Sequence, residues 1–308
     1  MNYDFSEREV LPHNKVKATA EFMTRDLLKT IEEKMPSFSK GQMKIANYIL
    51  ENYDKAAYIT AAKLGAIVNV SESTIVRFAY ELEFDGYHAM QLALRELIRT
   101  NLTSFERMEV ANDLMKENNV LDKVLATDID RIKHTLEEID RNAFDCAVRK
   151  IASARRIYVI GLRSASLIAG FLARNFSMIF DSVVLIQSTS GSEVFENIMQ
   201  IGPEDVLIAV SFPRYSKRVI KAVEFASKAG ANVISITDRD ASPIAEYADQ
   251  LLVAKSDMAS FVDSLVAPLS LVNAIIASVS LLRKDEVEQR LRKLEEIWEE
   301  YEVYDKQG

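Results

Sequence analysis

A single stretch, residues 206–229, constrains the fold of this chain more than any other, because it combines a strand, a polar loop and an amphipathic helix. Its first residues, VLIAV, form a continuous apolar run of strand length, as a strand covered on both faces requires. From Ser216 onward the apolar residues recur at helical spacing. The polar segment from Ser211 to Ser216 therefore lies where a parallel strand passes into a helix, and the N–H groups and dipole of a helix N-terminus favour an anion there. The segment is equally consistent with a plain strand end followed by a serine N-cap.

The same alternation of strand and helix is predicted along the rest of the C-terminal half. Apolar strands are expected at residues 157–160, 182–186, 206–210, 232–237 and 250–253, with helices between the first four. This order predicts an α/β domain with a doubly wound parallel sheet, whose ligands bind beyond the carboxyl ends of the strands. Hydroxyl-rich loops follow the first three strands, at residues 161–166, 188–192 and 211–216. Because none has the glycine and lysine spacing of a nucleotide-binding loop, a smaller anion is favoured over a nucleotide.

The composition restricts the class of protein. A chain of 308 residues with 48% hydrophobic content can bury a full core, and we expect two folded units. No apolar run reaches membrane-spanning length and the first residues lack a secretory signal, so we expect a soluble, cytoplasmic protein without a membrane partner. The single cysteine, Cys146, and three scattered histidines predict no internal disulfide, no metal site and no cofactor. The net charge of −8 means that any contact with nucleic acid must be local.

The N-terminal third is predicted to be all-α. Apolar residues about four apart, from Val16 to Met35, indicate an amphipathic helix that ends near Pro36. A capping box, Ser39 with Gln42, begins the next helix. Two short helices follow, at residues 60–67 and 71–82, and their three-residue separation is typical of a helix-turn-helix motif.

The second of these short helices is the candidate DNA reader. Its polar residues point outward in this interpretation, and they are Ser71, Glu72, Ser73, Thr74 and Arg77. Arg77 can bond a guanine edge at two points, and the N-terminal part of a recognition helix is where such contacts occur. We expect the core of the motif to contain Ala62, Leu64, Ile67, Val70, Ile75, Val76 and Leu82, with the small Ala61, Ala62 and Ala66 at the helix crossing. A generic three-helix bundle fits the same pattern.

Charge does not favour either interpretation of this helical domain. Residues 35–100 carry seven cations and seven anions, so the domain is neutral. A neutral domain that binds DNA is expected to act as two copies together, which predicts a homodimer or a dimer of dimers.

Two further helical stretches complete the chain. Residues 120–150 are strongly charged and are interpreted as a connector, with an apolar stripe that contains Leu121, Val124, Leu125, Ile129, Ile132, Leu136 and Ile139. The last helix, residues 286–304, has a seam of apolar residues three or four apart that packs on its own domain or on another subunit. The predicted division is an N-terminal extension and helix (1–36), a helix-turn-helix domain (37–105), a connector (106–150), a sheet domain (151–283) and a C-terminal helix (284–308).

Specific motifs resemble a known family. The run Ile75-Val-Arg-Phe78, followed by Phe84-Asp-Gly-Tyr87, resembles the N-terminal domain of the RpiR-type bacterial transcription regulators. It differs at Glu83, where the family usually has glycine. The sheet half resembles the sugar isomerase (SIS) domain, a flavodoxin-like fold, through IGLRSA at 160–165, AVSFPRYS at 209–216, VISITD at 233–238, SPIAEYAD at 242–249 and SFVDSLVAPL at 260–269.

This resemblance implies a phosphosugar sensor. In SIS enzymes the phosphate loop runs S-x-S-G-x-T, and the matching positions here are residues 211–216, with Pro213 and Arg214 in place of a hydroxyl and the glycine. Carried over, the phosphate ligands are Ser164, Ser211 and Ser216, with Ser166 and Arg214 as additional candidates. The expected partners are therefore operator DNA and a phosphorylated sugar effector.

Two alternatives stay open at this point. One is a phosphosugar isomerase, which needs a positioned base; because no histidine follows His134, a carboxylate or a water would have to serve in the sheet domain. The other is a phosphosugar-binding scaffold that lacks DNA affinity and uses the helical domain for dimerisation.

Overall fold

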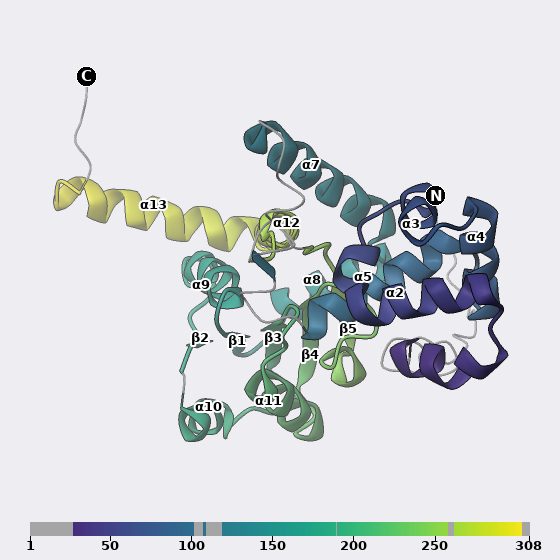
Figure 1. Cartoon of the computed structure of the whole chain (residues 1–308). Coiled ribbons are helices and arrows are strands. Elements are labelled where there is room, and N and C mark those ends of the chain that lie inside the picture. Colours follow the sequence, from purple (N-terminus) through teal and green to yellow (C-terminus); the bar gives the residue numbers. More distant parts are fainter. Residues whose placement is uncertain (1–26, 102–106, 109–118, 189, 258–261, 304–308) are drawn as a thin grey trace, which may run out of the picture. The chain divides into compact units, whose positions relative to one another are not determined.

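The chain divides into two compact units, Met1–Glu106 and Arg107–Gly308. The computed structural model describes residues 27–101, 107–108, 119–188, 190–257 and 262–303 (Figure 1). Of the first predicted helix, the part before residue 27 lies outside the described residues, and the remainder is helical as far as Lys34. Among the described residues, no single helix is long and apolar enough to cross a bilayer. Two consecutive helices, 266–282 and 284–300, reach that length and apolar composition only when taken together, and they are bent by 100° at their junction.

The first unit is a bundle of short helices, as predicted. Ser39 accepts from the backbone N–H of Gln42 while the Gln42 side chain accepts from that of Ser39, so the predicted capping box is confirmed. Phe38 packs edge-on against Phe78, with their ring centroids 5.2 Å apart. The elements of this unit are the 3₁₀ turn η1 (Met35–Ser37) and the helices α2 (Lys40–Ala56), α3 (Ala61–Val68), α4 (Glu72–Glu81) and α5 (Tyr87–Asn101).

The helix-turn-helix pair α3–α4 is confirmed, but the predicted packing between its helices is partly wrong. Ala62, Ala66 and Ile67 are exposed rather than packed between the helices, and Val70 and Val76 are only half-buried. The close approach depends on Gly65, where a Cβ atom would lie 2.8 Å from the carbonyl oxygen of Val70. Sequence periodicity missed this because an eight-residue helix has too few turns to define its buried face. The core of the pair is formed by Ala61, Leu64, Gly65, Ile75, Phe78, Ala79 and Leu82.

Glu83 adopts the backbone conformation that glycine usually supplies after a helix. Its φ is +67°, its N–H donates to the carbonyl of Tyr80, and the N–H of Phe84 donates to that of Ala79. These two bonds form a Schellman cap at the end of α4. The Glu83 carboxylate lies 3.0 Å from Lys34 Nζ, which also donates to the carbonyl of Glu81. The departure from glycine therefore leaves the turn intact and adds an ion pair.

We expect Glu83→Gly to be more stable than Glu83→Ala by about 1 kcal/mol. Both variants lose the exposed ion pair with Lys34, which contributes about 0–1 kcal/mol, but only alanine keeps the cost of a side chain at positive φ. Urea unfolding of the two variants measures the difference. Equal stabilities would show that the left-handed conformation carries no cost at this position.

The second unit is built on a five-stranded parallel sheet in the order β2-β1-β3-β4-β5, which confirms the predicted doubly wound arrangement. Each of the five predicted strands is present. The elements are α7 (Val120–Glu138), α8 (Arg141–Ala152), β1 (Ile157–Gly161), α9 (Ala165–Phe176), β2 (Val183–Ile186), α10 (Gly191–Ile198), β3 (Val206–Val210), α11 (Lys217–Lys228), β4 (Asn232–Thr237), η2 (Ala245–Tyr247), β5 (Gln250–Val253), α12 (Val266–Leu282) and α13 (Lys284–Glu300).

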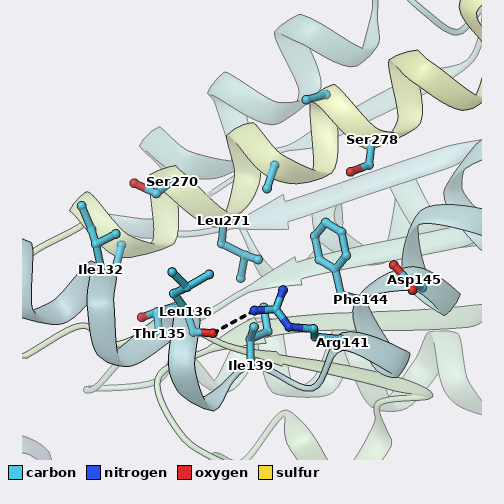
Figure 2. Close-up of a pocket in the computed structure, with 13 residues that line it drawn as sticks. Ile132, Thr135, Leu136, Ile139, Arg141, Phe144, Asp145, Ser270, Leu271 and Ser278 are labelled. Carbon is cyan, nitrogen blue, oxygen red and sulfur yellow. Dashed lines mark hydrogen bonds between the residues drawn. The ribbon is translucent and has the colours of Figure 1, made fainter.

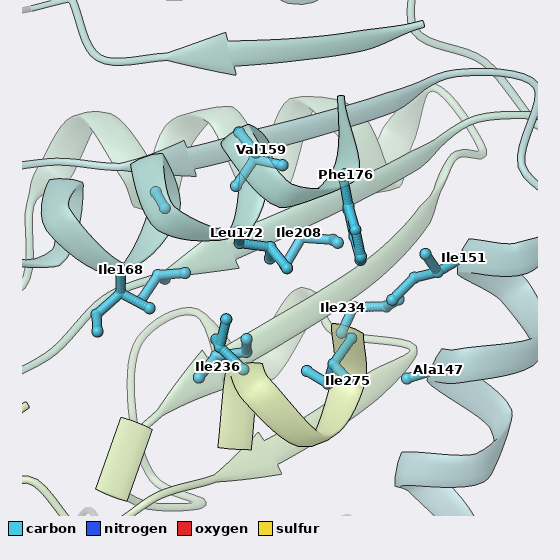
Figure 3. Close-up of a cluster of buried hydrophobic side chains, with 14 of the residues drawn as sticks. Ala147, Ile151, Val159, Ile168, Leu172, Phe176, Ile208, Ile234, Ile236 and Ile275 are labelled. Atoms are coloured by element: carbon cyan, nitrogen blue, oxygen red, sulfur yellow. The ribbon is translucent and has the colours of Figure 1, made fainter. Parts of the chain in front are cut away.

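Helices cover both faces of this sheet, which explains why its central strand is apolar throughout. Alternate residues of a strand point to opposite faces. In β3, Val206, Ile208 and Val210 face one cluster, which contains residues of α8, α9 and α12, as Figure 3 shows. Leu207 and Ala209 face the other, with α10 and α11. The segment expected as a connector contributes Ala147 and Val148 of α8 to the first cluster, so this part of it packs within the second unit.

Candidate functional site

The N-terminus of α4 is the candidate DNA-contacting surface of the first unit. Ser71 is its N-cap, with a side chain that accepts from the backbone N–H of Thr74. The Ser71 hydroxyl also lies 2.9 Å from that of Ser73 and 2.8 Å from that of Thr74. Ser71, Glu72, Ser73 and Arg77 are exposed and Thr74 is half-buried, so the five candidates lie together on an accessible helix end.

Arg77 folds back over the first turn of α4. Its Nε donates to the carbonyl of Ser73 at 3.2 Å, and an Nη donates to the Ser73 hydroxyl at 3.4 Å. Both bonds are exposed, so exchanging them for contacts to a nucleic acid costs little free energy. The exposed guanidinium is therefore free to leave the helix surface.

A buried tyrosine, Tyr87, connects by hydrogen bonds the helices that pack behind this surface. The Tyr87 hydroxyl lies within hydrogen-bonding distance of the carbonyls of Ala56 (3.2 Å) and Ile59 (2.9 Å), at the end of α2 and just before α3. Burial raises the pKa of Tyr87 to about 12, with Arg95 opposing the rise, so the hydroxyl remains a donor across the physiological range. Gln91 donates to the same Ile59 carbonyl at 2.7 Å. The start of α3 is thereby fixed to α5.

In the second unit, the loops that follow β1 and β3 begin side by side. These strands are paired in parallel with Gly161 opposite Val210, so both chains leave the sheet at its carboxyl edge. A Cβ on Gly161 would lie 2.6 Å from the carbonyl oxygen of Ala165, so glycine allows the tight entry into α9. Arg163 and Arg214, one in each loop, both have positive φ, near +60°. Non-glycine residues in this conformation cluster at functional sites.

Ser211 is the most enclosed of the predicted ligands. It is 4% exposed, its N–H donates to the carbonyl of Ile236, and its carbonyl accepts from the Thr237 hydroxyl at 2.8 Å. The backbone of Ser211 is thus held between β3 and β4. Within the described part of the chain, its own hydroxyl makes no hydrogen bond.

Ser164 and Ser216 are the N-caps of α9 and α11, and neither side chain caps its helix. The N-cap side chains of α2, α3, α4, α7 and α8, by contrast, all accept a backbone N–H, whereas those of α10, α12 and α13 do not. Neither first turn contains an acidic residue that would offset the helix dipole. Two helix N-termini at one sheet edge therefore present N–H groups and serine hydroxyls without a side-chain acceptor from their own caps.

The hydroxyls of the other serines in these loops are less available to a ligand, because they are bonded within their own loops. Ser166 donates to the carbonyl of Arg163 at 2.6 Å, which supports the first loop from within. In the loop after β2, Ser188 bonds to Glu193, and the hydroxyls of Ser190 and Ser192 lie 3.0 Å apart. The described serines of the β2 loop are thus engaged with their own loop, unlike Ser164, Ser211 and Ser216.

One cluster at this edge was missed by the sequence analysis. The Tyr215 hydroxyl donates to Asp238 at 2.8 Å and accepts from Arg239 Nε at 3.1 Å, while the guanidinium carbon of Arg239 lies 5.7 Å from the Tyr215 ring centroid. Asp238 is 3% exposed and follows β4 directly. The cluster ties the loop after β3 to the end of β4. The aspartate at a strand end was the only available signal, since the partners are 23 and 24 residues apart in sequence.

A cavity of about 550 Å³ lies elsewhere in the same unit, between α7, α8 and α12 (Figure 2). None of the candidate serines lines it. Its walls are mainly apolar, with Leu136, Phe144 and Leu271 among them, so it does not match the hydroxyl-rich edge of the sheet. Over the described ranges, no group of three or more His, Cys, Asp or Glu side chains could hold a metal ion.

Two family models match the two units. Residues 25–101 match the helix-turn-helix domain of the rpiR family, and residues 150–278 match the SIS domain. The chain is similar to an uncharacterized HTH-type transcriptional regulator of Caldanaerobacter subterraneus, with 24% identity over 88% of this chain and 96% of the relative. It is also similar to the HTH-type transcriptional regulator HexR of Escherichia coli, with 24% identity over 92% of this chain and 97% of the relative.

Two solved structures share the fold. The sugar isomerase domain of an RpiR transcription factor from Sphaerobacter thermophilus aligns with a TM-score of 0.56 and 24% identity, covering 58% of this chain and 99% of that domain. The Vibrio vulnificus NanR protein complexed with ManNAc-6P aligns with a TM-score of 0.55 and 24% identity, covering 88% of this chain and 97% of NanR.

Proposed function

Because the chain is an RpiR-type transcription regulator, with a helix-turn-helix domain followed by a SIS domain, we propose that a phosphorylated sugar bound in the SIS domain modulates its binding to operator DNA. The observation that carries this proposal is the position of Ser211, a residue that is 4% exposed at the carboxyl edge of the sheet and whose hydroxyl makes no hydrogen bond within the described chain. A hydroxyl whose hydrogen is not used within the protein can donate it to a bound anion. The similar NanR structure is complexed with ManNAc-6P, which supports a phosphorylated sugar as the ligand class.

The phosphate is proposed to bind where α9 and α11 begin. Ser164, Ser211 and Ser216 donate hydroxyl hydrogen bonds to it, and the uncapped N–H groups of both helices add their own. Arg214, exposed in the same loop, contributes positive charge, and Ser166 holds the first loop in place. The Tyr215–Asp238–Arg239 cluster positions the loop from the other side.

DNA is proposed to bind at the N-terminus of α4. Arg77 contacts a base edge, while Ser71, Ser73 and Thr74 bond phosphates. Glu72 either accepts from a cytosine amine or discriminates against other bases by repulsion. Two copies read two half-sites, because the neutral domain gains too little from phosphate contacts alone.

We propose no catalytic activity. An isomerase needs a base that is free to move a proton between adjacent sugar carbons. Two carboxylates beside these loops, Glu193 and Asp238, are already bonded to Ser188 and Tyr215. The named relatives are transcriptional regulators, which accords with a sensor rather than an enzyme.

A thermal-shift screen against phosphorylated sugars tests the ligand class. A sugar at about 100 times its dissociation constant should add about 2.7 kcal/mol to the stability of the unit that binds it. For a unit of about 200 residues this corresponds to a rise in melting temperature of roughly 5–10 °C. The matched control is the same sugar without phosphate, which should give no shift. A panel of phosphosugars that shifts nothing would contradict the proposal.

A further inference from the structure

Helix α7 presents its apolar side to solvent. Five large side chains at helical spacing form this stripe: Leu121 (67% exposed), Leu125 (53%), Ile129 (65%), Ile132 (37%) and Leu136 (58%). Figure 1 shows α7 apart from the strands of its unit, and the helix contacts α12. A contiguous apolar surface of this kind is rare on monomers and marks an interaction site.

The inner side of α7 is polar, and it fixes the helix in this orientation. Arg131 is 5% exposed and pairs with Asp128 at 2.8 Å, and Asp128 also accepts from the Ser264 hydroxyl at 2.6 Å. One turn further on, the Thr135 hydroxyl accepts from the backbone N–H of Lys255 at 2.9 Å. Rotating α7 to bury its stripe would break these buried contacts. It would also separate Arg131 from Asp128, which is costly for buried charges. The stripe therefore needs an occupant from outside its own unit's core.

The stripe leads into the cavity between α7, α8 and α12. Ile132 and Leu136 belong both to the stripe and to the cavity wall, as Figure 2 shows. The opposite wall is α12, a helix of 17 residues without a charged side chain, whose small Ala274 and Ala277 are exposed there. One surface thus carries large protruding side chains at one end and a hollow lined by small ones at the other.

The spacing of the stripe is nearly symmetric about Ile129. An antiparallel copy of α7, related by a two-fold axis half a residue before Ile129, would place Leu121 against the partner's Leu136 and Leu125 against the partner's Ile132. The protruding Leu121 end of each copy would then lie over the cavity of the other. Exposed charges of both signs flank the stripe, with Lys123 and Lys133 beside the carboxylates of Asp122, Asp130, Glu137 and Glu138, so each copy presents lysines as well as carboxylates to the other.

We propose that a second copy of this chain covers the stripe, through an isologous interface in which two α7 helices pack antiparallel about Ile129. The inference rests on the proposed function only in that two copies act together on DNA. Dimerisation through another surface, such as the exposed face of α13, would overturn this interface and leave the proposed function intact. A different protein or another segment of the chain on the stripe is the alternative that the following experiments exclude.

Engineered cysteines test the geometry in a Cys146→Ser background. Ile129→Cys should form a disulfide between copies on mild oxidation, because the two-fold axis brings this position next to itself within the Cα separation of about 7 Å that a disulfide allows. Leu121→Cys alone should not cross-link, whereas Leu121→Cys combined with Leu136→Cys should. These two positions are about 22 Å apart along one helix, so any bond between them joins two copies. No cross-link at Ile129→Cys in a protein that sediments as a dimer would overturn the proposal.

A charge substitution tests whether the stripe holds the copies together. Ile129→Glu should leave the fold unchanged, because the side chain is 65% exposed, and should convert a dimer at about 10 µM into a monomer by bringing two carboxylates together. Ile297→Glu on α13, where the isoleucine is 40% exposed, is the matched control and should remain dimeric. Analytical ultracentrifugation gives the mass, and circular dichroism confirms the fold. A dimeric Ile129→Glu, or a monomeric parent, would overturn the proposal.

Discussion

Replacing Ser211 by alanine is expected to weaken phosphosugar binding about ten- to 150-fold, since a hydrogen bond from a hydroxyl to a charged phosphate contributes about 1.5–3 kcal/mol. The substitution removes one oxygen from a residue that is 4% exposed and whose hydroxyl has no partner within the described chain, so the fold should tolerate it. At a sugar concentration that shifts operator affinity in the parent, the variant should show no shift. Its operator affinity without sugar should match that of the parent.

The design separates a lost ligand contact from a folding defect. Ser153→Ala is the matched control, because Ser153 follows α8 at the opposite end of the sheet and bonds only to carbonyls of its own helix. Calorimetric titration with the sugar and fluorescence anisotropy with the operator provide the two affinities. If Ser211→Ala bound the sugar as tightly as Ser153→Ala, Ser211 would not be a phosphate ligand. If Ser211→Ala also bound the operator more weakly in the absence of sugar, the substitution would affect the DNA-binding unit by a route that does not involve the sugar.

Arg77→Ala is expected to weaken operator binding by about 1–3 kcal/mol per half-site and to relax the preference for one base pair. The guanidinium is exposed, and its bonds to Ser73 lie within one turn of α4, so its removal should not disturb the fold. Arg77→Lys keeps the charge without the forked donor pair, and it isolates base reading from phosphate attraction. It should retain affinity for unrelated DNA at matched salt and lose the base preference.

Competition binding with operators altered at single positions checks this prediction. A uniform loss across all sequences in Arg77→Ala, with a reduced salt dependence, would mean that Arg77 contacts a phosphate. Parent-like affinity for every operator would show that α4 is not the reading helix.

Much of the architecture was predictable because its signals are local. The VLIAV run of β3 is apolar throughout, since helices cover both faces of the sheet, and the S-x-x-Q box of α2 satisfies its own N-terminal donors. Glu83 departs from the helix-turn-helix motif of the family, yet its turn has the hydrogen bonds of a Schellman cap. Backbone hydrogen bonds fix the geometry of this turn, and the residue type at position 83 changes only the free-energy cost of adopting it.

The parts that sequence could not predict depend on contacts between distant residues. Ala62 and Ile67 are apolar but exposed, because Gly65 sets how close α3 approaches the following turn. Tyr215, Asp238 and Arg239 come together only once β3 and β4 are paired. In α7, the residues at the buried face are polar, so the apolar stripe marked the outer side of the helix rather than the core.

Reciprocal titration tests most directly whether this one chain couples the binding of a phosphosugar to the binding of operator DNA. Operator affinity is measured with and without saturating sugar, and sugar affinity with and without saturating operator. Because coupling is a single free energy, both ratios should agree and differ from one by about 5- to 150-fold. A sugar that binds with the expected affinity but leaves operator affinity unchanged, with a ratio of one in both directions, would contradict the account.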